Sequence, residues 1–546
     1  MRGLKTMEAE TRFPPRYIIH QYWARKPWSV VRGLVEEFCP VGGTVLDPFM
    51  GSAVTCFESL SQNRNFIGID INPVSVLMAK FYSNPPDLIK IKTTFDNIIT
   101  SSHACATELY NTRCPDCNSD VKIINSIWKN GDPVSMYLNC NECDFRGNKK
   151  YSDEDLSLLE SINSKLDEHW FPKDVKMPTQ SDVDEYEDLF SLRNRVALSF
   201  LFSQIDNLDD GPEKDVLLLA FTSLLPRMSR MVFINEHRRS KGVNPAGVWG
   251  EKRYWVPNEH IENNVFHYFN ERKTKFVDAI EDIGEFQQNT DYIKSIISLG
   301  SATNLSDIPN ESVDFCFTDP PYGDAVKYLD LSTIWNAWIS PEGVKSELEV
   351  LPRNNDLETY SRLLNASIKE IHRVLKENSF FAIAFQSTKP KIWKILLDSI
   401  SSAGFQLVDL SSVRPSKKSH NQLDMSGSAK NDIILLLQKS HASKETELRS
   451  TDISFESSVI SVAKEQCKLG QSSPYQIYEN LVMKYSRAYL ESNGESKFPL
   501  ISIPKINKLL TESNLFDTLQ IEEFDYKGEL RSIILWCLSE YNVDNP

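Results

Sequence analysis

The stretch GTVLDPFMGSAVT, residues 43–55, decides the fold expected for this chain. Its apolar start predicts a buried strand, the residues around Gly51 a tight turn, and the rest a helix that runs to about Leu60. A second apolar run, Phe66–Asp70, predicts the next strand and closes a β-α-β unit. Gly51 and Asp70 lie 19 residues apart. In nucleoside-binding sheets such a turn lets the ligand approach the backbone, and the acid that ends the next strand binds ribose hydroxyls.

A second motif, TDPPYG at residues 318–323, follows the apolar run 312–317. This places it at the carboxyl end of a buried parallel strand, where open α/β sheets carry their chemistry. The two prolines hold the backbone extended and remove two N–H donors, which leaves carbonyl groups free. The Asp319 carboxylate, a carbonyl and the Tyr322 ring then suit a planar group that bears an amine. Taken alone, the motif is also compatible with an ordinary loop.

Together the two stretches resemble the motifs of amino-methyltransferases, enzymes that methylate the exocyclic amine of adenine or cytosine in DNA. The first resembles the D-P-F-x-G-S-G-T motif that binds S-adenosylmethionine, and the second the D-P-P-Y motif. His20 and Lys26-Pro27 also match residues that this family carries shortly before the first strand. The resemblance covers residues 13–80 and 296–438, about two fifths of the chain. It implies an α/β fold with a Rossmann-like methyltransferase sheet.

The same resemblance implies roles for the matching residues. Asp47 would face the methionine end of the cofactor, Gly51 would line its backbone, and Asp70 would hold its ribose. The residues expected to bind S-adenosylmethionine are His20, Lys26, Pro27, Asp47, Pro48, Phe49, Gly51, Ser52, Asp70 and Ser301. The residues expected to be catalytic are Asp319, Pro320, Pro321 and Tyr322.

Two residues depart from the family pattern. Ala53 stands where the family usually has glycine. If that position needs a positive φ, alanine costs on the order of 1 kcal/mol there. Ser301 replaces an acid that lies near the adenine of the cofactor in the family. The alanine would reduce cofactor affinity, and the serine would either weaken recognition of the adenine or take over the acid's hydrogen bond through its hydroxyl.

Four cysteines form two C-x-x-C knuckles separated by 22 residues: Cys114, Cys117, Cys140 and Cys143. Four thiolates in this arrangement can close a tetrahedral Zn²⁺ site, and a single redox pair would not need the second knuckle. Disulfides are disfavoured in a reducing cytosol. We therefore expect a structural zinc ribbon, in which no coordination position is left for catalysis. The ribbon resembles that of a group of adenine-specific DNA methylases.

Composition places the chain among soluble proteins, with 41% hydrophobic and 25% charged residues. No run of 18 apolar residues and no apolar N-terminal signal occurs, so we expect a cytoplasmic protein without membrane insertion. The net charge of −15 argues against a surface coated by nucleic acid, but it leaves room for a local basic groove. Candidate phosphate contacts are Arg238, Arg239, Lys241, Lys252, Arg253, Arg414, Lys417 and Lys418. Both basic stretches are equally compatible with solvated loops.

Four regions are expected. Residues 1–82 form the first methyltransferase part, and residues 83–295 an insertion for target recognition with the zinc ribbon at 108–150. Residues 296–440 form the second methyltransferase part, and 441–546 a C-terminal helical region. Within these regions, helical patterns are expected over residues 258–297, 475–490 and 530–541.

The motifs favour a DNA methyltransferase that transfers a methyl group from S-adenosylmethionine to the N6 amine of adenine in double-stranded DNA. The base would be flipped out of the duplex and methylated directly. An Asp rather than a Ser before Pro320 favours adenine within the family pattern. Three alternatives stay open. They are methylation of N4 of cytosine or of RNA, methylation of a protein amide, and an impaired DNA-binding or scaffold subunit that works with restriction or defence partners.

Overall fold

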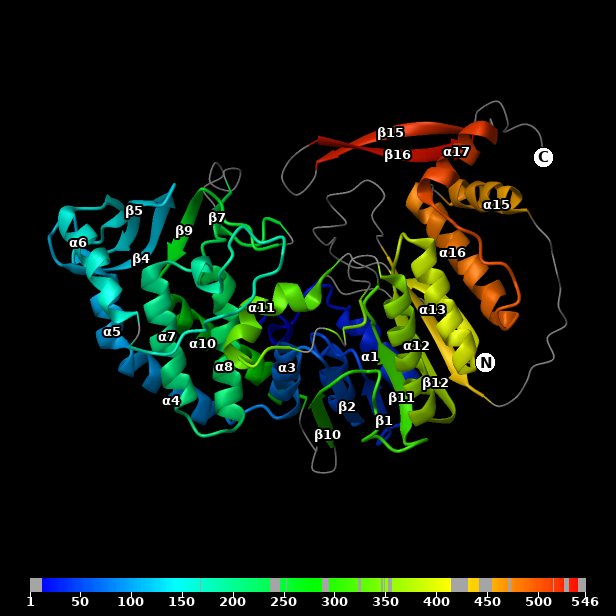
Figure 1. Ribbon diagram of the computed structural model, residues 1–546, viewed down its shortest axis with the longest axis horizontal. Helices are drawn as coiled ribbons and strands as arrows, with labels where there is room; N and C mark the ends of the chain where they lie inside the picture. The colour runs from blue at the N-terminus through cyan, green and yellow to red at the C-terminus, as the bar shows by residue number, and fades with distance from the viewer. Residues whose placement is uncertain are drawn as a thin grey trace.

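The computed structural model describes most of the chain. The described residues are 12–166, 168–235, 246–251, 253–286, 294–322, 326–344, 347, 349–351, 356–413, 431–440, 454–469, 473–513, 515–524 and 530–538. Figure 1 shows an elongated molecule in which a central sheet lies between the insertion at one end and C-terminal helices at the other.

The central sheet has the topology that the two motifs predict. Its strands, in spatial order, are β10 (Ser295–Leu299), β2 (Asn65–Asp70), β1 (Thr44–Asp47), β11 (Val313–Thr318), β12 (Leu375–Phe385), β14 (Asp432–Lys439) and β13 (Phe405–Val413). The pairs from β10 to β12 are parallel, whereas β14 is antiparallel to both of its neighbours. The strand order reverses between β1 and β11, and such a switch point opens a crevice for ligands.

Helices cover both faces of this sheet, as the alternating side chains of the strands require. Val45 of β1 joins the core on the face of α1 (Trp28–Phe38), α2 (Val54–Leu60) and α3 (Pro73–Ser83). Leu46, the next residue, joins the core on the face of α12 (Leu357–Val374) and α13 (Pro390–Ala403). The expected helix after Gly51 and the expected strand at 66–70 are confirmed as α2 and β2.

The insertion shares the first of these two cores. Its helices are α4 (Leu88–Ser101), α5 (His103–Tyr110), α6 (Asp153–Ser161), α7 (Leu192–Asp206), α8 (Pro212–Met228) and α10 (Val265–Gly284), with short 3-10 turns at Ile162–Lys165 and Tyr186–Leu189. Helix α8 packs against both α3 and α11 (Tyr328–Ile339). Trp338 of α11 lies 5.0 Å from Phe202 and 4.9 Å from Phe221, measured between ring centroids. The insertion is therefore joined to the sheet by continuous packing.

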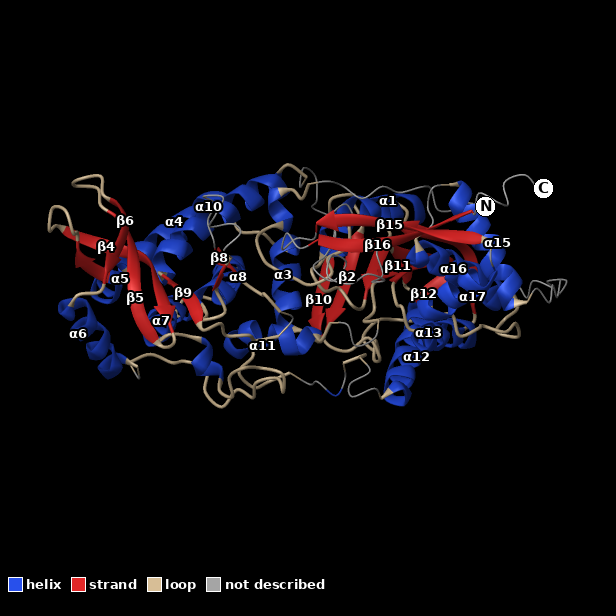
Figure 2. Cartoon of the chain, turned by 90° about the horizontal axis from the view of Figure 1, so that it is seen from above, coloured by secondary structure: helices blue, strands red, loops and turns tan. Residues whose placement is uncertain are grey.

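A second, antiparallel sheet lies at the far end of the insertion (Figure 2). Its strands are β3 (Asn111–Arg113), β4 (Asp120–Lys129), β5 (Asp132–Asn139), β6 (Arg146–Lys150), β7 (Phe233–Ile234), β8 (Ala246–Gly247) and β9 (Glu259–Asn263). The β3-β4 and β5-β6 connections carry the two cysteine knuckles. The expected split of a methyltransferase sheet by an insertion with a four-cysteine ribbon is confirmed.

The C-terminal region consists of α15 (Phe455–Lys468), α16 (Pro474–Glu491), α17 (Ile503–Ser513) and a hairpin of β15 (Phe516–Phe524) and β16 (Leu530–Leu538). The helix expected at 475–490 is confirmed. The helix expected at 530–541 is wrong, because 530–538 pairs as a strand with β15. A short apolar run does not distinguish helix from strand until its partner is known.

The helical expectation for 258–297 is correct only at its centre. Helix α10 covers residues 265–284, but residues 259–263 form β9 beside β4, and 295–299 form β10 beside β2. Pairing with distant strands thus overrides the local pattern at both ends. None of the described helices is long and apolar enough to cross a membrane.

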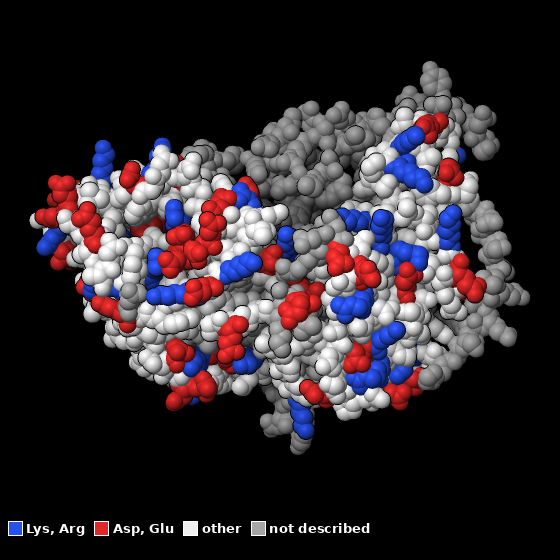
Figure 3. Space-filling view, in the orientation of Figure 1, with Lys and Arg blue, Asp and Glu red and all other residues white. Residues whose placement is uncertain are grey.

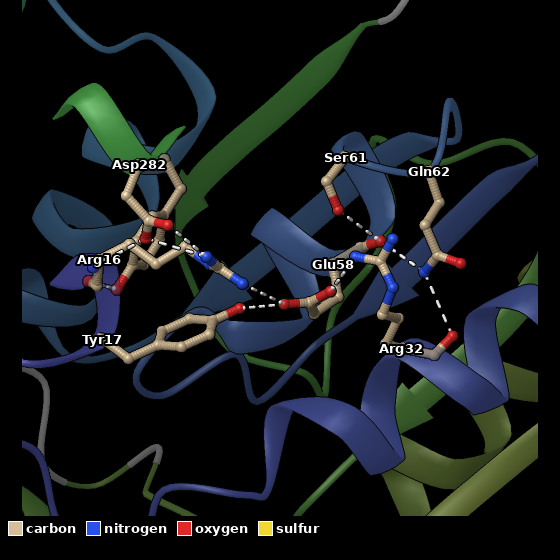
Figure 4. Close-up of polar contacts among 8 residues, drawn as sticks. Arg16, Tyr17, Arg32, Glu58, Ser61, Gln62 and Asp282 are labelled. Carbon is tan, nitrogen blue, oxygen red and sulfur yellow. Dashed lines mark hydrogen bonds and ion pairs between the residues drawn. The ribbon is translucent and has the colours of Figure 1, made fainter. Parts of the chain in front are cut away.

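A buried charge cluster fixes the N-terminal segment between the two halves of the molecule (Figure 4). Arg16, in the short 3-10 helix Pro15–Tyr17, donates two hydrogen bonds to Asp282 of α10, at 2.9 and 3.0 Å. On its other side Arg16 lies 3.6 Å from Glu58 of α2, which is fully buried. Glu58 also accepts hydrogen bonds from Tyr17, at 2.6 Å, and Arg32, at 3.1 Å. The cluster therefore ties the N-terminal segment to both the sheet and the insertion.

Replacing Asp282 by alanine should lower the free energy of unfolding by about 3 kcal/mol, because Arg16 would keep a buried charge with one partner fewer. The matched control is Glu281→Ala on the same helix, which breaks only the exposed pair with Lys92 and should cost less than about 1 kcal/mol. Urea unfolding followed by tryptophan fluorescence measures both. Equal losses for the two variants would contradict the role given to the cluster.

Candidate active site

A cavity opens at the carboxyl ends of β1, β2 and β11, at the switch point of the sheet. Its volume is about 830 Å³, including the open mouth. The residues expected from the sequence that line it are Lys26, Asp47, Pro48, Phe49, Gly51, Ser52, Asp70, Ser301, Asp319 and Pro321. The structure therefore brings the residues of the two motifs together around one cavity.

The turn after β1 is held by the acid at the end of β2. The backbone N–H of Gly51 donates to Asp70 at 2.8 Å, and the N–H of Asn72 donates to the other oxygen of Asp70 at 2.9 Å. Gly51 has a φ of +47°, and a Cβ at this position would lie 3.1 Å from the ring of Tyr22. The site therefore needs glycine here for both conformation and space. Burial raises the pKa of Asp70 to about 7.

Asp47 joins the two motifs. Its side chain is 3% exposed and accepts hydrogen bonds from the hydroxyl of Thr318 at 2.8 Å and from the N–H of Phe49 at 3.2 Å. Thr318 is the last residue of β11 and directly precedes Asp319. Burial raises the pKa of Asp47 to about 6, whereas these hydrogen bonds act in the opposite direction. One carboxylate thus sets the spacing between the two neighbouring strand ends.

Asp319 and Asp432 both contact the ammonium group of Lys26. The Nζ of Lys26 lies 3.0 Å from Oδ2 of Asp319 and 3.0 Å from Oδ2 of Asp432. The second carboxylate oxygen of Asp319, Oδ1, is buried and has no hydrogen-bond partner among the described residues. Burial raises the pKa of Asp319 to about 7, against the lowering effect of Lys26. Burial acts to lower the pKa of Lys26, but the two carboxylates raise it well above its usual value.

Four residues expected at the site lie outside the cavity lining: His20, Pro27, Pro320 and Tyr322. His20 is buried between the Gln21 carbonyl, at 2.7 Å, and the hydroxyl of Thr222 on α8, at 3.2 Å. Burial lowers its pKa to about 3, so its ring is neutral and ties the N-terminal segment to the insertion. Pro27 immediately precedes α1. The ring of Tyr322 lies 5.2 Å from the Nζ of Lys26, beside the cavity.

The cavity also contains residues that the sequence did not reveal as site residues. Tyr22 stacks on Tyr328 with ring centroids 6.0 Å apart, and both line the cavity with Asn72 and Glu349. Asp432 was missed because it stands far from both motifs. One signal was present, since Asp432 directly precedes the apolar run of the closing strand β14. An antiparallel last strand begins at the edge where the parallel strands end.

The four cysteines of the ribbon form a compact cluster. Their Sγ atoms all lie within 4.8 Å of one another, with 3.6 Å between those of Cys114 and Cys143 and 3.7 Å between those of Cys117 and Cys140. A zinc ion with sulfur ligands at about 2.3 Å in tetrahedral geometry requires sulfur atoms about 3.8 Å apart. The donor set and its spacing therefore fit Zn²⁺.

The basic candidates for phosphate contacts are largely outside the described residues: Arg238, Arg239, Lys241, Lys252, Arg414, Lys417 and Lys418. Arg253 is described, and its guanidinium pairs with Asp182 and, at 2.5 Å, with Glu251. Figure 3 shows Lys and Arg side chains intermixed with Asp and Glu over this face of the molecule. The described part of this face therefore offers no broad area of positive charge.

Comparison with known proteins identifies the fold around the cavity. The sequence model of a DNA methylase family, N6_N4_Mtase, matches residues 5–81 and 313–504. These two segments are similar to the N6/N4 DNA methylase family. The gap between them coincides with the insertion, and the second segment continues beyond β14 through α15 and α16. The match thus includes helices of the C-terminal region.

Individual relatives agree with this family. The type II methyltransferase M.MjaII of Methanocaldococcus jannaschii is 23% identical over 380 residues, which are 64% of this chain and 65% of that protein. The type II methyltransferase M.BglI of Bacillus subtilis is 38% identical over 77 residues, 13% of this chain and 22% of that protein. The chain thus spans less than two thirds of either relative. A SAM-dependent methyltransferase from Methanosarcina mazei aligns at 12% identity over 30% of this chain and 76% of that chain, with a TM-score of 0.16.

Ala53 stands where the methylase family usually has glycine. Its backbone is left-handed, with φ 58° and ψ 28°, so this position does need a positive φ. We expect Ala53→Gly to leave the free energy of unfolding within about 1 kcal/mol of the wild type. The relief of roughly 1–2 kcal/mol of backbone strain offsets the loss of about 0.8 kcal/mol from one buried methyl group.

The matched control is Ala79→Gly, which removes an equally buried methyl group from the interior of α3. It should cost about 2 kcal/mol, because the helix penalty of glycine adds to the lost burial. Urea unfolding of both variants gives the comparison. An equal loss in the two would show that Ala53 carries no strain.

Proposed function

We propose that this chain is a DNA methyltransferase that transfers a methyl group from S-adenosylmethionine to the N6 amine of adenine in double-stranded DNA. The observation that carries the proposal is the buried Oδ1 of Asp319 in the cavity wall, which has no hydrogen-bond partner among the residues that the structure describes. An unpaired buried acceptor is costly unless a ligand supplies the donor. An exocyclic amine on a planar base is such a donor.

The charges of the cavity lining support the assignment of S-adenosylmethionine as the cofactor. The acids in its lining, Asp47, Asp70, Asp319 and Glu349, outnumber the cations, Arg25 and Lys26. This suits a ligand with a positive sulfur and a positive amino group. We propose that Asp70 holds the ribose hydroxyls, that Asp47 faces the methionine end and that Ser301 lies toward the adenine. When bound, the cofactor would supply a methyl group activated by its positive sulfur.

Asp319 would orient the target amine and take up its proton. A base inside a duplex cannot reach this carboxylate, so we propose that the base is flipped out, at a cost of a few kcal/mol, and stacked on Tyr322. The Oδ1 of Asp319 and the Pro320 carbonyl would accept hydrogen bonds from the amine and hold its nitrogen toward the methyl group. Because burial raises the pKa of Asp319 above its usual value, the same oxygen can also bind the proton released in the transfer.

The proposal also covers the target base, the role of the insertion and the partner proteins. Asp before the Pro-Pro-Tyr motif favours N6 of adenine over N4 of cytosine. We propose that the insertion, joined to the sheet through α8 and α11, contributes to target recognition. The two relatives are named type II methyltransferases, and we extend that class, with restriction or defence proteins as partners, to this chain.

The reaction is tested with radiolabelled S-adenosylmethionine and unmodified genomic DNA, followed by digestion to nucleosides. We expect label in N6-methyladenine, and its loss in Asp319→Ala with cofactor binding retained in calorimetry. The control is Asp307→Ala, an exposed acid in the loop before β11, which should keep full activity. Normal turnover of Asp319→Ala would refute the assignment.

Other results of the same experiment separate the alternatives. Label in N4-methylcytosine would keep the reaction class and change the base. Cofactor binding without labelled DNA would indicate an RNA or protein substrate, or a missing partner. A chain that binds no cofactor would be an inactive DNA-binding or scaffold subunit.

For the cysteine cluster we propose a structural zinc ion bound by Cys114, Cys117, Cys140 and Cys143. The purified protein should contain about one zinc per chain by elemental analysis. Cys117→Ser should lose most of it, because a hydroxyl replaces a thiolate ligand. The control is Cys105→Ser, a neighbouring cysteine of α5 outside the cluster. Equal zinc in the two variants would exclude the site.

A further inference from the structure

Asp432 occupies a place in the candidate active site that neither motif assigns. It is the first residue of β14, the antiparallel strand next to β12. Its side chain is 17% exposed and contacts Lys26, which lies 406 positions away in the sequence. Lys26 in turn contacts Asp319. The three side chains thus form one chain of contacts from β14 to the end of β11.

The two carboxylate oxygens of Asp319 have different surroundings. Lys26 contacts Oδ2, whereas Oδ1 is free among the described residues. A lysine ammonium has three donors and no fixed plane, so a lysine with one carboxylate partner can move across both of its oxygens. A second carboxylate at 3.0 Å, that of Asp432, gives Lys26 a competing partner that does not belong to Asp319.

The start of β14 is itself fixed by the C-terminal region. Glu479 of α16, which is 3% exposed, accepts a hydrogen bond from the side chain of Asn431 at 2.8 Å. The hydroxyl of Tyr475, also on α16, donates to the backbone carbonyl of Asn431 at 3.4 Å. Because Asn431 immediately precedes Asp432, helix α16 sets the position from which Asp432 reaches Lys26.

We propose that Asp432 is a positioning residue that holds the Lys26 ammonium on Oδ2 of Asp319 and so keeps Oδ1 free for the target amine. This inference rests on the proposed methyl transfer. The positive charge of Lys26 favours the ionised form of the buried Asp319, against the effect of burial. Asp432 confines that charge to one oxygen.

The roles of Lys26 and Asp432 predict opposite changes in the pH dependence of kcat. The charged and titratable groups that face Asp319 are Lys26, Asp432, Asp47, Tyr322 and Tyr328. Removing the negative charge of Asp432 stabilises ionised Asp319, so the acid limb of the profile should move to lower pH. Removing the positive charge of Lys26 should move that limb to higher pH.

The test compares Asp432→Asn and Lys26→Met with the wild type in labelled methyl transfer across pH. Asp432→Asn should lower kcat about 100-fold at the optimum, because Lys26 then covers both oxygens of Asp319. Its KM for DNA and the cofactor Kd from calorimetry should stay unchanged. Asp432→Glu should recover part of the activity, because it restores the competing carboxylate.

The control is Asp314→Asn. Asp314 is the second residue of β11 and lies near the amino end of this strand, whereas the cavity opens at its carboxyl end. Asp314 is also 17% exposed and pairs with Lys376 at 2.6 Å, so its loss removes a comparable ion pair without touching the cavity. Unfolding midpoints of both Asn variants exclude a difference in folding. If Asp432→Asn has the same kcat as Asp314→Asn and the same acid limb in its pH profile, the inference is overturned while the proposed function stands. A wild-type chain that transfers no methyl group overturns both.

Discussion

The position of the N-terminal segment depends on the fully buried carboxylate of Glu58, and the candidate active site depends on that segment. A buried carboxylate requires cations and hydrogen-bond donors around it, and Arg16, Tyr17 and Arg32 supply them. Arg16 also binds Asp282 of the insertion, so one guanidinium joins the helix after the first motif to the segment inserted between the motifs. Between this cluster and α1, residues 22–26 run along the cavity. Tyr22 and Lys26 lie in this segment and form part of the cavity wall.

The local parts of the fold were readable from the sequence because each depends on neighbours in the chain. The strand, turn and helix of residues 43–60 and the paired cysteine knuckles have patterns with short spacing, and the structure contains them. The contact between Lys26 and Asp432 has no such pattern, because it depends on β14 running antiparallel to its neighbours. The errors at residues 259–263 and 530–538 have the same origin. These segments become strands only because β4 and β15 lie beside them.

The insertion and the cavity are joined through two segments of the chain. His20 contacts Thr222 of the insertion, and six residues later Lys26 contacts Asp319. Helix α11, which begins with Tyr328 in the cavity wall, ends near Trp338 in the aromatic core of the insertion. A displacement of the insertion would therefore be transmitted to both sides of the cavity through packed side chains. Such packing has discrete arrangements and does not deform freely.

The C-terminal helix α16 supports the candidate site from outside the cavity. The family match extends through α16, although this helix contributes no residue to the cavity lining among the described residues. Its contacts with Asn431 and with the Ser387 carbonyl, at 2.9 Å from Tyr478, fix the ends of β14 and β12 at the edge where Asp319 lies. Helix α16 supplies these contacts from outside the sheet. Placing the anchor outside the cavity leaves the space in front of Oδ1 open to a ligand.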